Sequence, residues 1–245
     1  MSGGRAEGAG AVMLADVVDL LARLHDREVD AAFLEGWQAS ALTQWMAGIL
    51  ASADADEALA GMAAAFGALP RPPDPASLDD LASDFADIYL THAYRISPNG
   101  SVWLTEDGLE RQGPMFETRS WYRRYGVEVP DWRKRPDDNL VHQLQFTAHL
   151  LRLDTGDARA DCARFLDAGL LVWLPDFADR VDARARTPFY RAAARLTHAV
   201  VEEIRDALLA STGIERRSPE VKRTGSSGSP EPEMAAYVPG QAESW

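Results

Sequence analysis

The sequence predicts an all-α protein, a bundle of about ten helices with disordered termini. Three observations favour this class. Apolar residues recur at three- and four-residue spacing in one segment after another, residues that start or stop helices separate these segments, and the chain has neither a repeat of fixed period nor long heptads. With 245 residues, 46% of them hydrophobic, it can bury a core as one large domain or two small ones.

The first five helices are separated by short turns. The first is amphipathic, the fourth is rich in alanine and suited to close packing, and the prolines of residues 70–75 end the fourth. Ser77 offers an N-cap for the fifth helix, which is aromatic in its C-terminal half. These helices are expected at residues 12–25, 30–37, 40–51, 54–69 and 78–94.

A long connection follows the fifth helix. Residues 97–100, Ser-Pro-Asn-Gly, form a turn by their chemistry. The residues after this turn alternate apolar anchors with turn formers, which is typical of a packed, non-helical connection. Helix resumes at residues 115–125 and ends at Gly126, as a C-terminal glycine predicts, and residues 127–134 are a linker.

The next helix, expected to begin at Pro136, is the element around which the chain is organised. Proline is tolerated in a first turn, and Asp137 and Asp138 favour the positive end of the helix dipole. Thr187 and Pro188 likewise form an N-cap and first turn for the last helix. The helices of this half are expected at residues 136–153, 158–171, 176–185 and 189–210.

Composition divides the chain into four parts and limits its partners. Disordered termini are expected at residues 1–10 and 213–245, and two helical parts at residues 11–134 and 135–212. The net charge of −13 disfavours nucleic acid and anionic membranes and favours a basic partner. Cys162 is the single cysteine, and no export signal or membrane span is visible, so a cytoplasmic protein is expected.

No pattern of residues indicates catalysis. The chain lacks a phosphate-binding loop, a dinucleotide-binding glycine motif, a zinc-protease motif and a nucleophile elbow. The closest pair of histidines is seven residues apart, too far for a metal pair one helical turn apart. Asp137 and Asp138 could be a carboxylate pair for acid–base catalysis, but consecutive residues on a helix point about 100° apart. We therefore expect neither an enzyme, nor a metal site, nor a cofactor.

Two groups of residues are candidates for binding, and each has an ordinary structural explanation. Phe85, Ile88 and Tyr89 lie on one face of the aromatic helix, where a core stripe is the default interpretation. The polar cluster of residues 135–139 is either a capping turn or the rim of a binding groove. The residues alone leave both alternatives open.

The order of short motifs along the chain resembles the TorD/DmsD family of cytoplasmic maturation chaperones. These chaperones act on molybdenum-containing reductases that are exported by the twin-arginine pathway. The resemblance covers residues 12–210 and depends on shared order and spacing, since no single motif is specific. The motifs are DFADIYL (84–90), GSVWL (100–104), RPDDNL (135–140), FL (165–166), WLPDF (173–177) and PFYRA (188–192).

The resemblance implies a TorD-like bundle with a hinge carrying the motif Glu-Pro-x-Asp-His, a region implicated in binding the partner's leader peptide. Pro136 and Asp138 match this motif, whereas Arg135 and Asn139 replace its glutamate and histidine. The remaining positions that the resemblance assigns to leader or partner binding are Phe85, Ile88, Tyr89, Ser101, Trp103 and Asp137.

The implied function is that of a non-enzymatic chaperone. Its partners would be a twin-arginine leader peptide and the apo form of a molybdoenzyme catalytic subunit, bound by a monomer or a domain-swapped homodimer. Such a leader needs an apolar groove with an acidic rim. Phe85, Tyr89 and Trp103 could supply the groove, and Asp137 and Asp138, with the overall charge of −13, the rim. A helical adaptor that binds a mature subunit rather than a leader is the alternative, which Arg135 and Asn139 favour, and a nucleotide-dependent enzyme is disfavoured by the missing phosphate loop.

Overall fold

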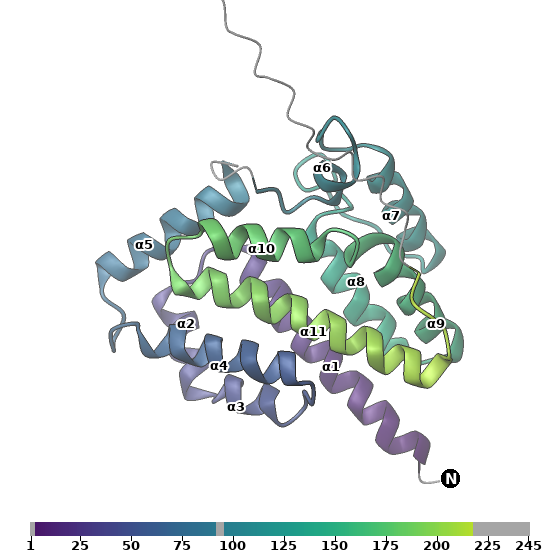
Figure 1. The fold of residues 1–245 in the computed structure, drawn as a ribbon, viewed down its shortest axis with the longest axis horizontal. Helices are drawn as coiled ribbons and strands as arrows, with labels where there is room; N and C mark the ends of the chain where they lie inside the picture. Colours follow the sequence, from purple (N-terminus) through teal and green to yellow (C-terminus); the bar gives the residue numbers. More distant parts are fainter. Residues whose placement is uncertain (1–2, 92–95, 218–245) are drawn as a thin grey trace, which may run out of the picture.

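The computed structural model describes residues 3–91 and 96–217, with side chains from Gly10 onward. Within these ranges the chain forms eleven α-helices, two π-helical turns and no strand, which confirms the all-α prediction (Figure 1). No helix in them combines the length and apolarity that a membrane crossing requires. The elements are α1 (Gly3–Asp26), α2 (Ala31–Ala39), α3 (Leu42–Ala47), α4 (Ala53–Gly67), α5 (Pro75–Phe85), η1 (Ala86–Leu90), α6 (Gly100–Leu104), α7 (Gly113–Arg124), α8 (Leu140–Leu153), α9 (Gly156–Phe165), η2 (Leu166–Leu170), α10 (Leu174–Arg184) and α11 (Pro188–Thr212).

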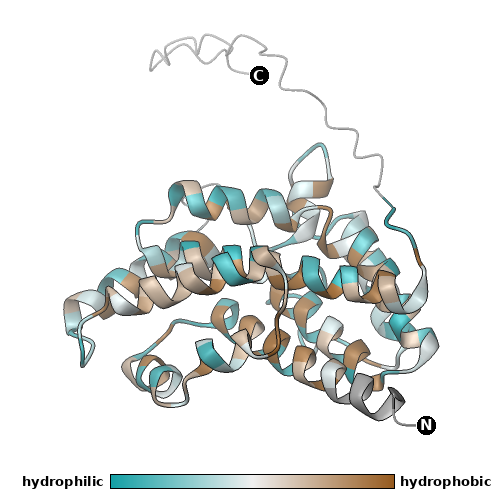
Figure 2. Ribbon diagram, turned by 60° about the horizontal axis from the view of Figure 1, so that its bottom comes forward, coloured by the Kyte–Doolittle hydropathy of each residue, from teal (hydrophilic) through white to brown (hydrophobic). Residues whose placement is uncertain are grey.

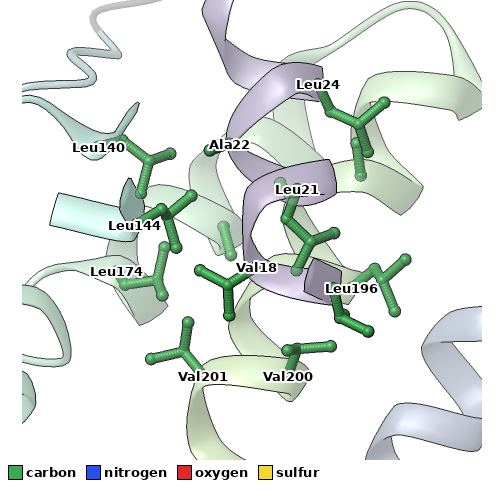
Figure 3. Close-up of a cluster of buried hydrophobic side chains, with 14 of the residues drawn as sticks. Val18, Leu21, Ala22, Leu24, Leu140, Leu144, Leu174, Leu196, Val200 and Val201 are labelled. Atoms are coloured by element: carbon green, nitrogen blue, oxygen red, sulfur yellow. The ribbon is translucent and has the colours of Figure 1, made fainter. Parts of the chain in front are cut away.

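Two long helices, α1 and α11, form the centre of the bundle. Helix α1 packs along α8 and contacts α11, which in turn packs on α4, α9 and α10. Figure 3 shows Val18 and Leu21 of α1 in one apolar cluster with Leu144 of α8 and Val201 of α11, and all four are fully buried. Apolar residues gather on the inner faces of the helices and polar residues on the outer faces (Figure 2). The core therefore contains residues from both predicted helical parts.

At both ends the described structure extends a few residues beyond the predicted bounds of the helical parts. Helix α1 begins at Gly3, although disorder was expected up to residue 10. Adding turns to a helix that is already fixed by packing is much easier than starting one. At the other end, Ile214 packs against the core and its carbonyl accepts a hydrogen bond of 2.9 Å from Arg205. Residues 213–217 thus belong to the folded part, and residues 218–245 lie outside the described ranges.

The aromatic helix starts earlier than predicted, and its C-terminal part has a π-helical turn. Its N-cap is Asp74, whose carboxylate accepts a 2.7 Å hydrogen bond from the Ser77 amide, and Pro75 occupies the first turn, so Ser77 is not the cap. Helix α5 ends at Phe85 and continues as the π-helical turn η1. The predicted end near residue 94 falls within residues 92–95, outside the described ranges.

Helix α8 begins later than expected, after a longer connection from α7. Helix α8 starts at Leu140, with Asn139 as the N-cap that accepts a hydrogen bond of 3.1 Å from the Val141 amide. Pro136 therefore belongs to a turn that precedes the helix. In addition, α6 is a short helix within the connection that was predicted to be non-helical. Its start depends on a contact with Asp138, which the local pattern could not reveal.

Candidate functional site

Two turns that are far apart in sequence lie against each other. An isolated antiparallel bridge pairs Asn99, before α6, with Asn139, before α8. The Gly100 amide donates a 2.9 Å hydrogen bond to the Asp138 carbonyl across this bridge. The structure therefore brings together the two segments that carry the GSVWL and RPDDNL motifs.

Asp138 holds the start of α6. Its Oδ2 accepts hydrogen bonds from the Ser101 amide at 2.6 Å and from the Ser101 hydroxyl at 2.5 Å. The side chain is only 1% exposed, and burial raises the pKa of this carboxyl group above its usual value. The predicted residues Ser101 and Asp138 thus form one buried capping interaction.

Asp137 is also buried and fully engaged. Arg119 holds it in a two-pronged ion pair, with Nε at 3.1 Å from Oδ1 and Nη2 at 2.7 Å from Oδ2. The hydrogen bond to Asp137 raises the pKa of Arg119. Because Asp137 and Asp138 both lie inside the protein, the acidic rim predicted at these positions is not at the surface in this structure.

The predicted apolar and aromatic site residues lie mostly in the core. Ile88 is fully buried, and Phe85 and Tyr89 are buried with ring centroids 4.7 Å apart. Trp103 is half-buried, its indole N–H donates to the Ser97 carbonyl at 2.8 Å, and the Arg180 guanidinium lies 4.6 Å from its ring centroid. The core stripe considered for the aromatic helix is therefore correct for Ile88, while Phe85 and Tyr89 also reach a cavity.

Tyr89 belongs to a buried hydrogen-bond chain that includes His25. The hydroxyl of Thr197 donates its one proton to the Ala193 carbonyl at 2.8 Å. Thr197 must therefore accept from His25 Nε2, at 2.8 Å, and the Tyr89 hydroxyl donates to His25 Nδ1, at 2.6 Å. Burial lowers the pKa of His25 to about 3, so the ring is neutral at physiological pH.

A cavity of about 310 Å³ lies where these elements meet, and we call it the hinge pocket. Its wall includes half of the predicted site residues, together with residues that the sequence did not single out. The predicted members are Phe85, Tyr89, Arg135, Pro136 and Asn139, and the others include His25, Asp26, Leu90, Asn99, Glu110 and Lys134. The remaining predicted residues, Ile88, Ser101, Trp103, Asp137 and Asp138, lie outside its wall.

Charges of both signs surround the hinge pocket. The Arg135 guanidinium forms an ion pair with the Asp26 carboxylate and donates a second hydrogen bond, of 3.0 Å, to the Asp26 carbonyl. On another wall, the Asn99 side-chain amide donates to Glu110 at 2.7 Å. Asp26 and Glu110 thus supply the acids that were predicted at residues 137 and 138. No local pattern in the sequence places Asp26 beside Arg135, because 109 positions separate them.

Comparison with known proteins decides the family. The sequence model of the family described as nitrate reductase delta subunit matches residues 50–179, more than half of the chain. The chain belongs to this family. The match begins just before α4 and ends within α10, so it contains the aromatic helix, both bridged turns and most of the hinge pocket.

Relatives of this chain carry the name chaperone protein TorD, which confirms the resemblance to the TorD/DmsD family. Those of Vibrio vulnificus, Vibrio cholerae and Shewanella loihica are 31%, 33% and 31% identical over 126, 141 and 131 residues. The alignments cover 48%, 53% and 51% of this chain and 59%, 62% and 60% of the relatives. The chain thus matches about three fifths of their length, and their names are those of chaperones and not of enzymes.

Proposed function

We propose that this protein is a cytoplasmic chaperone for the maturation of a molybdenum-containing oxidoreductase. It binds the twin-arginine leader, the apo catalytic subunit or both, and holds the subunit for cofactor insertion before export. The observation that supports this proposal best is the hinge pocket, whose wall includes five positions that correspond to the family's leader-binding region, two of them, Arg135 and Asn139, with other residue types. Its partner would be bound without any chemical change. A monomer or a domain-swapped homodimer is compatible with this activity.

The composition of the hinge pocket suits a basic, partly apolar peptide. Phe85 and Tyr89 give it aromatic surface, and Leu90, 60% exposed, adds an apolar side chain at the surface. Asp26 and Glu110 provide negative charge for the basic start of a leader. A twin-arginine leader combines these two features in one segment, a basic start followed by an apolar run.

Substitution of Leu90 tests this assignment without disturbing the core. We expect Leu90→Ser to weaken binding of a twin-arginine leader peptide by about 1–2 kcal/mol, because an exposed apolar contact with the leader is lost. The measurement is calorimetric titration of the peptide. Leu153→Ser is the matched control, since Leu153 is 43% exposed at the end of α8 and does not line the hinge pocket. Equal effects of the two substitutions would contradict the assignment.

A helical adaptor that binds a mature subunit without recognising a leader is the second candidate. The observations that favour it are the burial of Asp137 and Asp138 and the presence of Arg135 and Lys134 at the hinge pocket. Titrating an apo catalytic subunit with and without its leader separates the two functions. Binding that requires the leader supports the chaperone proposal, whereas equal affinity for both forms supports the adaptor.

A further inference from the structure

The end of α1 forms a binding site for a guanidinium group. Asp26 is the last residue of α1, so its carbonyl lies at the negative end of the helix dipole. The carboxylate and the carbonyl of this one residue both accept hydrogen bonds from the Arg135 guanidinium. A planar guanidinium presents several donors in a fixed fork, which an ammonium group cannot imitate. The hinge pocket therefore contains an arginine site that is filled by a residue of the same chain.

The interaction that fills this site is exposed enough to exchange. The side chains of Arg135 and Asp26 are 35% and 32% exposed, and ion pairs of this kind contribute little to stability. By contrast, the Arg119 and Asp137 side chains are 18% and 3% exposed, so that pair is a structural one. An arginine brought by a partner can compete for Asp26 without disrupting the core.

A second acid of the hinge pocket also lies near an arginine of the same chain, although this arginine donates its shorter bond, of 2.8 Å, to the Arg133 carbonyl. Glu110 lies 3.4 Å from the Arg111 guanidinium, and the two side chains are 29% and 39% exposed. The hinge pocket thus contains two carboxylates, Asp26 and Glu110, each next to an arginine of the chain itself. This arrangement is complementary to a peptide that carries two arginines.

We propose that Arg135 occupies the place of a partner arginine and that the incoming guanidinium displaces it from Asp26. This inference rests on the proposed function, in which an arginine-bearing leader enters the hinge pocket. Arg135 then acts as an internal competitor that lowers the affinity for such peptides. Asp26 is the residue that recognises the arginine, and Arg135 is the residue that sets the affinity threshold.

A set of four proteins tests the competition: wild type, Arg135→Gln, Asp26→Asn and the double variant. In calorimetric titrations with a twin-arginine leader peptide, Arg135→Gln should tighten binding by up to about fivefold, because the competitor is removed. Asp26→Asn should weaken binding, and Arg135→Gln should give no gain when combined with it. For a peptide with lysines in place of the two arginines, Arg135→Gln should increase the affinity less, since an ammonium group lacks the forked donors of a guanidinium.

The matched control is Arg152→Gln. Arg152, in α8, likewise forms ion pairs with acids of α1, Asp16 and Asp19, and is 39% exposed, but it lies outside the hinge pocket. This substitution should leave the affinity for the peptide unchanged. A gain in affinity for Arg135→Gln that persists without the Asp26 carboxylate would overturn the proposal, as would no gain at all.

A probe that does not depend on the leader keeps the two proposals distinguishable. In Arg135→Gln, argininamide should shift the carboxyl carbon resonance of Asp26, whereas lysinamide should shift it much less. If the leader peptide binds to none of the four proteins but this shift is seen, leader recognition fails and the arginine site stands. If the leader binds and argininamide leaves the Asp26 resonance unchanged, the arginine site is disproved and the proposed function stands.

Discussion

His25 is a buried histidine whose two ring nitrogens both form hydrogen bonds while the ring stays neutral. It accepts from the Tyr89 hydroxyl and donates to Thr197, so neither nitrogen is free to take up a proton without breaking a hydrogen bond. With a pKa of about 3 in the folded protein and about 6.5 in the unfolded chain, the unfolded chain binds more protons between these values. Stability contributed by this residue is therefore complete above about pH 6.5 and is lost toward pH 3.

Acid should weaken the folded state through His25. We expect the free energy of unfolding to fall by about 2 kcal/mol between pH 8 and pH 5 because of this residue. Urea unfolding of wild type and His25→Gln at several pH values gives the free energy of unfolding of each as a function of pH. The contribution of His25 is the difference between the slopes of these two pH curves. His149→Gln, at a half-buried position, serves as the control. Parallel curves for wild type and His25→Gln would contradict the expectation.

Residues of the candidate site could be selected from the sequence, but their surroundings could not. The resemblance identified Asp137, Asp138 and Arg135, and the structure places all three at the bridged turns. Their partners are Arg119, Ser101 and Asp26, which are 18, 37 and 109 positions away. Burial and charge pairing depend on those distant partners, so a carboxylate expected at a rim can be a structural one.

Helix α11 shows how one element depends on another for its start. Pro188 occupies its first turn as predicted, but the side chain of its N-cap residue, Thr187, makes no capping bond. Asp84 of α5 supplies the acceptor instead, through hydrogen bonds from the Thr187 amide at 2.8 Å and the Thr187 hydroxyl at 2.6 Å. Asp84 also accepts from the Arg186 amide at 3.1 Å and is fully buried.

Removing this carboxylate should cost more than removing an ordinary helix cap. We expect Asp84→Ala to lower the free energy of unfolding by about 2–3 kcal/mol, because it leaves several donors unpaired inside the protein. Asp74→Ala removes the exposed cap of α5 and should cost less, because the donors that it leaves can bind water. Urea denaturation compares the two variants. A cost for Asp84→Ala no greater than that for Asp74→Ala would show that the capping contact is unimportant.

The predicted bounds of a helix agree best with the structure where an apolar stripe runs along its whole length. Helices α4, α7 and α10 begin and end within about two residues of the expected positions, since their apolar period and their flanking prolines and glycines are local signals. Helix α6 and the two π-helical turns, η1 and η2, were missed. Helix α6 starts on Asp138, and hydropathy periods cannot distinguish a single π turn from the end of an α-helix.

Residues 213–217, the last part of the chain that the structure describes, pack over a buried ion pair of the bundle. Arg205, fully buried, forms hydrogen bonds of 2.7 and 2.8 Å with Asp167 and a further one with the Ile214 carbonyl. The Arg217 amide adds a bond of 3.1 Å to the same carboxylate. The sequence placed these last residues in a disordered tail, because their composition carries no sign of the buried ion pair that they cover.

Truncation at two points tests the role of this segment. A chain that ends after Arg217 should melt close to the full chain, since every contact described above is kept. Ending the chain after Thr212 should lower the free energy of unfolding by about 1–3 kcal/mol, because buried Arg205 loses the Ile214 carbonyl. Calorimetric melting and urea titration measure the difference. Identical stability of the two truncated chains would rule out this role.

The pairing of α1 with α8 has a consequence for how the protein is made. Helix α1 leaves the ribosome long before α8, and its apolar face, with Val18 and Leu21, has no partner until Leu140 and the residues after it have been synthesised. At roughly 5–20 residues per second, extension from Asp26 to Leu140 takes on the order of 6–23 s. During that interval the nascent chain exposes an apolar helix face, so a protein proposed to shield another chain needs shielding during its own synthesis.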